Sequence, residues 1–146
     1  MTNEASISLN TIAIRKLIVV TLLFMGIGTG LELYLLDHYE DTLQLLPIIC
    51  ILTSILLFAA LLFMNSNGLQ LAFKLVLVAT ALSGLVGTFL HLKANYEFES
   101  EMKPTADTWS VLVESLSGAL PALAPGSMIL FSLIGYIYLL LINQKK

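Results

Sequence analysis

The sequence predicts an all-α membrane protein whose four transmembrane helices form an up-down bundle. Four apolar runs, 17–36, 45–64, 69–92 and 119–142, each reach the roughly 20 residues that a helix needs to cross the hydrocarbon core. Hydrophobic residues make up 58% of the chain and charged residues only 12%, about half the charged share of an ordinary soluble domain. Nearly every acidic residue lies between the first and second runs or between the third and fourth.

A single integral membrane domain accounts for residues 1–146, because four such helices leave only short loops and tails. With their flanking residues, the spans are expected at about 15–38, 43–64, 69–95 and 119–142, and an outer loop at 96–118. The first apolar run exceeds the roughly 7–15 residues of a signal-peptide core, so it should remain as a helix.

The charged residues predict the orientation, because basic residues beside the spans stay preferentially in the cytoplasm during insertion. Five of the seven basic residues lie at the end that holds both termini and the 65–68 turn: Arg15, Lys16, Lys74, Lys145 and Lys146. All the acids except Glu4 lie towards the opposite end. We therefore expect a multi-pass protein of the plasma (inner) membrane with both termini cytoplasmic and an acidic outer face.

Glu32 is the only acidic residue expected within the hydrocarbon, about 8–9 Å from the bilayer centre at 1.5 Å per residue. A carboxyl group at that depth is costly and usually faces the interior of a bundle. We expect Glu32 to face inward, either as a functional group or as a protonated or hydrogen-bonded clamp between helices.

Small residues in the first and third spans predict close helix packing, within the bundle or between two copies of the chain. These residues are Gly26, Gly28, Gly30, Ser83, Gly84 and Gly87. The Gly-x-Gly-x-Gly run lies inside an apolar helix and lacks the preceding strand of a nucleotide-binding loop. No nucleotide site and no nucleic-acid partner are expected.

Two span entrances contain proline and leave alternatives open. The second span begins either near Thr42, capped by Asp41 and Gln44, or at Pro47. Pro121 and Pro125 remove two backbone donors ahead of the fourth span. That span therefore begins at 119 or, after a broken or partly re-entrant entry, near residue 126.

A short amphipathic helix is predicted before the fourth span, because Trp109, Leu112, Val113 and Leu116 recur at i, i+3, i+4 and i+7. The indole of Trp109 favours the headgroup zone, so this helix could lie on the outer membrane surface. The alternative is a lid that packs on the mouth of the bundle itself.

The two histidines, His38 and His91, are expected about 15–18 Å from the midplane on the same side of the membrane. Imidazole together with carboxylate suits zinc, iron or manganese. The sequence thus predicts that His38 and His91 converge and, with Glu40 or Glu97, bind a divalent metal. The competing interpretation is that these groups are merely solvated at the membrane interface.

The function that these features favour is a small binding or accessory subunit, whose acidic outer face binds a protein partner or a divalent metal. Catalysis is not indicated. A b-type haem protein for electron transfer is one alternative, with the two histidines as axial ligands, although haem propionates would prefer basic surroundings. A small proton- or ion-coupled carrier using Glu32 is another, although few polar residues continue its path to the cytoplasm.

Overall fold

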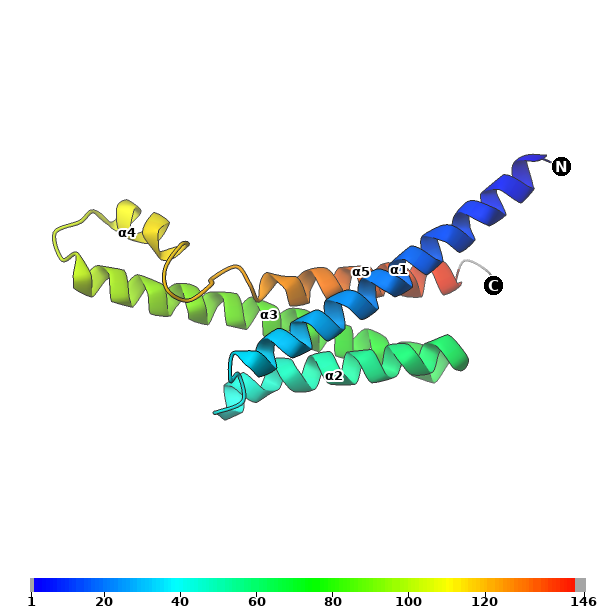
Figure 1. Cartoon of the computed structure of the whole chain (residues 1–146), viewed down its shortest axis with the longest axis horizontal. Helices are drawn as coiled ribbons and strands as arrows, with labels where there is room; N and C mark the ends of the chain where they lie inside the picture. Colours follow the sequence, from blue (N-terminus) through cyan, green and yellow to red (C-terminus); the bar gives the residue numbers. More distant parts are fainter. Residues whose placement is uncertain (1, 144–146) are drawn as a thin grey trace.

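The computed structural model describes the backbone of residues 2–143 and the side chains from Asn10 onward, so Lys145 and Lys146 lie outside the described residues. Its elements are α1 (Thr2–Leu35), α2 (Thr42–Phe63), α3 (Asn67–Met102), α4 (Thr108–Ser115) and α5 (Gly126–Asn143) (Figure 1). No strand occurs in the described part of the chain. Four helices, α1 from Asn10 onward, α2, α3 and α5, are long and apolar enough to cross a membrane. The predicted all-α class is confirmed, and the four predicted spans correspond to these four candidate membrane-spanning helices.

The four long helices pack side by side. α3 contacts α2 and α5, α1 contacts the same two helices, and α4 packs on α3. Figure 1 shows both termini and the α2–α3 turn at one end, which we name the basic end for Arg15, Lys16 and Lys74. The opposite end holds the loop 36–41 and the segment 93–125, and we name it the acidic end.

Aromatic and hydroxyl side chains from α2, α3 and α5 fill the centre. The Phe58 ring stacks on Phe73 with ring centroids 5.8 Å apart and meets the fully buried Tyr138 edge-on at 5.0 Å. Ser54 and Thr80, both fully buried, share a hydrogen bond of 3.0 Å between their hydroxyl groups. Since a buried hydroxyl needs a partner, this pair fixes the register of α2 against α3.

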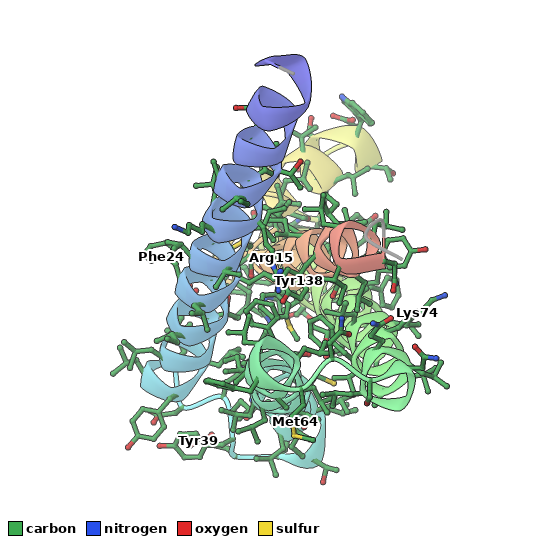
Figure 2. The ribbon with its side chains drawn as sticks, turned by 90° about the vertical axis from the view of Figure 1, so that its right-hand side faces the viewer. Arg15, Phe24, Tyr39, Met64, Lys74 and Tyr138 are labelled. Atoms are coloured by element: carbon green, nitrogen blue, oxygen red, sulfur yellow. The ribbon has the colours of Figure 1, made fainter. Side chains whose placement is uncertain are left out.

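α1 is the most loosely packed of the four long helices, since from Asn10 to Leu35 its buried residues are Leu22 and Gly26. A Cβ on Gly26 would lie 2.9 Å from Ile55 Cγ1, so the glycine allows α1 to approach α2 closely. The large side chain of Phe24 is 78% exposed and points away from the other helices (Figure 2). Such apolar exposure is what a lipid-facing helix surface requires.

The α1–α2 connection is a tight reversal. Asp37 has φ 53°, in the left-handed region that Asp adopts more readily than most residues. Asp41 then caps α2 in a capping box with Gln44, so α2 begins at Thr42 and Pro47 lies inside it. The sequence allowed this helix to start either near Thr42 or at Pro47, and in the structure it starts at Thr42.

α3 is far longer than a membrane span. Its 36 residues extend over roughly 54 Å at 1.5 Å per residue, against a hydrocarbon core of about 30 Å. The helix continues to Met102, and α4 follows after a short link. The region 96–118, expected to be an outer loop, is therefore mostly helical and projects beyond the apolar part of the protein.

The entrance of the last span is broken, as one of the two alternatives predicted. α5 begins at Gly126 rather than at 119. The preceding backbone is tied by i→i+3 hydrogen bonds, including Ala124 N to Pro121 O at 3.1 Å and Gly126 N to Leu123 O at 3.0 Å. These tight turns satisfy backbone groups that the two prolines would otherwise leave without partners.

Candidate functional site at the acidic end

Asn95 holds the broken entrance against α3. Its side chain is 3% exposed, and its Nδ2 donates to the backbone oxygens of Ser115 at 2.9 Å and Leu120 at 2.7 Å. Its Oδ1 accepts from the backbone N–H of Leu120 at 3.0 Å. Gly118 lies directly over the amide, where an added Cβ would come within 2.5 Å of Asn95 Cγ. One asparagine thus fixes the chain between α4 and α5.

His91 lies one helical turn before Asn95 and contacts the same segment. Its Nδ1 is 3.2 Å from the backbone oxygen of Pro121. A carbonyl can only accept, so this contact requires the proton on Nδ1 and leaves Nε2 with a free lone pair in the neutral ring. His91 and Asn95, four residues apart, use one face of α3 as expected for that spacing.

The rings of His38 and His91 meet at the acidic end. Their centroids are 6.2 Å apart and the ring planes make an angle of 72°. His38 follows the left-handed Asp37, and its backbone N–H donates to Leu33 O at 2.9 Å. The two histidines come from elements far apart in sequence, and the structure brings them together as their common depth predicted.

The pKa of His38 is lowered from its usual value of 6.5. Partial burial is the larger cause, because it disfavours the charged imidazolium, and the neighbouring His91 adds to it. The carboxylate of Asp41 acts in the opposite direction. Neutral imidazole is the form that binds metal ions and accepts hydrogen bonds.

The two predicted carboxylate ligands are not gathered around the histidines. Glu97 forms an exposed ion pair with Lys93 at 3.6 Å. Glu40 is exposed, and its backbone N–H donates to Gln44 Oε1. Among the side chains of residues 10–143, no three His, Cys, Asp or Glu residues form a group that could hold a metal ion. Of the four predicted ligands, the structure brings together the two histidines.

The expectation that Glu32 faces the interior is wrong. Its side chain is exposed on the outside of α1. The packed line of α1 includes Gly30, where an added Cβ would lie 3.5 Å from Ile51. Glu32 is two residues further on, about 200° around the helix, and so lies on the opposite side. A carrier pathway through an interior Glu32 therefore has no support in this arrangement.

The small residues mostly pack within the chain. An added Cβ on Gly84 would lie 2.7 Å from Pro125 O, and one on Gly87 would lie 3.0 Å from Pro125 Cβ. Ser83 is also buried. These positions let the broken entrance lie close against α3. Gly28 has no side-chain neighbour within 4 Å of an added Cβ, so it takes no part in this packing.

α4 packs on α3 through the side opposite its predicted apolar stripe. Val111 and Ser115 are buried, with exposed fractions of 4% and 0%. Lys103 links the two helices, because its ammonium pairs with Glu99 of α3 at 3.5 Å and with Glu114 of α4. Asp107 caps α4 by accepting from Trp109 N and Ser110 N. The helix is thus docked on its own chain.

The predicted stripe on α4 remains uncovered. The exposed fraction is 71% for Trp109, 36% for Leu112, and 47% each for Val113 and Leu116. We call these four residues the α4 stripe. The sequence indicated the stripe but not the buried face, because Val111 and Ser115 are too few and too mixed in polarity to form a pattern.

Comparison of the chain with protein-family models, with curated proteins and with solved structures gave no match.

Proposed function

We propose that this chain is a small four-span plasma-membrane subunit with cytoplasmic termini, and that its acidic end binds a protein partner outside the membrane. The observation that carries the proposal is the α4 stripe, an apolar surface held on a projecting and rigidly docked helix. The Lys103 link and the buried Val111 keep α4 in place, so the stripe is presented without a large ordering cost.

The surrounding charge favours a protein over an anionic lipid surface as the occupant. Helices that lie on membranes usually carry Lys or Arg on the polar face. α4 carries Glu114 and no basic residue, and Asp107 precedes it. Glu97 and Glu101 extend the acidic surface along α3. An aromatic and aliphatic patch with an acidic rim fits a partner that offers an apolar pocket and basic residues.

Purification of the tagged full-length chain from its native membrane in mild detergent tests this proposal. A partner should co-purify in fixed proportion with the wild type and should dissociate as salt is raised, since exposed charges are screened. The double variant Trp109→Ser/Val113→Ser should no longer co-purify with the partner. The control variant Leu56→Ser, at an exposed position within α2, should still co-purify with it. Equal recovery from both variants would contradict the proposal.

A divalent metal at His38 and His91 is the second candidate, and the anchored ring of His91 favours it. Metal-binding histidines usually donate their other ring N–H to a carbonyl or carboxylate, as His91 Nδ1 does to Pro121 O. Two imidazoles would need further ligands from water or from the partner. Zinc, iron and manganese should be measured in the wild type and in His38→Ala/His91→Ala. Equal, substoichiometric metal in both would rule out this site.

A further inference from the structure

At the basic end, far from the α4 stripe, one side of α1 together with Leu141 of α5 borders an open hollow of about 470 Å³. Its walls are formed by Thr11, Ile12, Arg15, Lys16, Val19, Val20 and Leu141. The first turns of α1 diverge from the other helices (Figure 1). The hollow begins just after these turns, at Thr11. It therefore combines two cations with an otherwise mostly aliphatic lining.

Arg15 is held in place by the rigid core. Its Nη2 donates to Tyr138 Oη at 3.4 Å, and its Cζ lies 5.7 Å from the centroid of the Tyr138 ring. Tyr138 is fully buried and packs edge-on against Phe58. Figure 2 shows Arg15 and Tyr138 next to each other between α1 and α5. The guanidinium is thus positioned before any ligand arrives.

Neither cation of the hollow is neutralised by the described part of the chain. None of the ion pairs among the side chains of residues 10–143 involves Arg15 or Lys16. Glu4 precedes Arg15 by three helical turns, roughly 16 Å along α1. The contact with Tyr138 uses one of the five N–H donors of the guanidinium. Donors therefore remain for an anionic ligand.

The depth of the hollow matches the boundary between headgroups and hydrocarbon. Arg15 and Lys16 immediately precede the apolar run that starts at Leu17, and Leu141 lies near the end of α5. Val19 and Val20 continue from the cations into the apolar part of α1. An amphiphile entering here would place its charged group between the cations and its chain along the valines.

We propose that this hollow binds an anionic phospholipid of the leaflet at the basic end. Arg15 and Lys16 hold the phosphate, and the aliphatic side chains contact the first part of an acyl chain. Arginine binds phosphate oxygens in a bidentate manner, and basic pockets between transmembrane helices are a recurring site for anionic headgroups. Inorganic phosphate would leave the aliphatic wall uncovered, which makes it the weaker ligand.

Native mass spectrometry of the full-length chain in detergent, titrated with phosphatidylglycerol or phosphatidylcholine, measures this binding. The wild type should bind phosphatidylglycerol about tenfold more tightly than phosphatidylcholine, which corresponds to a difference in binding free energy of about 1.4 kcal/mol. Arg15→Gln/Lys16→Gln should lower retention to the phosphatidylcholine level. Lys74→Gln is the matched control, because Lys74 lies at the same end but against Tyr136, and it should leave retention unchanged.

Two further measurements keep the test decisive. Lys16→Gln alone alters an exposed side chain and should weaken retention even if changes at Arg15 disturb folding. Inorganic phosphate at millimolar concentration should fail to displace the lipid, and displacement would identify a simple phosphate site instead. Equal retention of both lipids by the wild type, or an equal loss in Lys74→Gln, would overturn the proposal.

Discussion

The side-chain amide of Asn95 forms two hydrogen bonds with the backbone of Leu120: Nδ2 donates to the Leu120 oxygen at 2.7 Å, and Oδ1 accepts from the Leu120 N–H at 3.0 Å. This reciprocal pair joins the projecting part of α3 to the broken entrance of α5. It also sets where the chain returns from α4, and so where the α4 stripe is presented. The geometry of the acidic end therefore depends on one buried side chain.

Asn95→Ala should destabilise the protein by about 1–3 kcal/mol, because it removes the partner of the buried Ser115 oxygen and of the Leu120 N–H. Thermal unfolding in detergent measures the loss. The matched change Gln70→Ala removes an exposed side-chain hydrogen bond to Asn65 and should have little effect. Similar melting temperatures for the two variants would mean that the Asn95 contacts are not important for stability.

Gly84→Ala should also be destabilising, by about 1–3 kcal/mol. Its new Cβ would lie 2.7 Å from a backbone oxygen, that of Pro125, which has no flexible end to move aside. Gly28→Ala provides the control, since nothing lies within 4 Å of its Cβ, and alanine has the higher helix propensity. The prediction fails if Gly84→Ala melts at or above the temperature of Gly28→Ala.

The lowered pKa of His38 predicts that acid weakens the fold. Because the folded pKa lies below the unfolded value of 6.5, the unfolded state binds more protons in the window below 6.5. Stability therefore decreases as pH falls through that window. Unfolding measured between pH 7 and pH 5 should show a steeper loss for the wild type than for His38→Gln.

The cause of that lowered pKa can be tested separately by titrating the His38 ring by NMR. His91→Gln should raise the pKa of His38, because it removes a neighbouring group that can carry positive charge. Asp41→Asn should lower it further, since asparagine can still cap α2 but brings no negative charge. No change in either variant would contradict the arrangement of the three side chains.

The orientation can be tested by reporter fusions. A reporter joined at Asn67 should report the cytoplasm, and one joined at Lys103 should report the outside, because the basic residues cluster at the Asn67 end. The reverse result would place the acidic end in the cytoplasm and would require a cytoplasmic partner.

The sequence predicted those features that depend on the length of an apolar run or on the position of a residue along a helix. Apolar runs identified the four helices, and counting residues along two of them brought His38 and His91 to one level. The sequence did not predict which side of α1 faces the other helices, and so the position of Glu32 was wrong. α1 is apolar nearly all round, so its residue pattern does not reveal the packed face. The continuation of α3 was missed although no Gly or Pro interrupts residues 93–103. The hydrogen bonds between the Asn95 side chain and the Leu120 backbone were also not predicted, because the two residues are too far apart in sequence for a local pattern to indicate the contact.

The central claim is that the α4 stripe binds a protein partner, and site-specific photo-crosslinking in intact cells tests it most directly. A photoreactive residue at Val113 should capture one protein, and the same residue at the exposed position Leu56 of α2 should capture lipid. Adding Glu97→Lys/Glu101→Lys to the Val113 probe should abolish the protein adduct through charge repulsion, and neither change touches the Lys103 link that holds α4 on α3. Capture of lipid alone at Val113, or a protein adduct that persists in the charge-reversed chain, would contradict the claim.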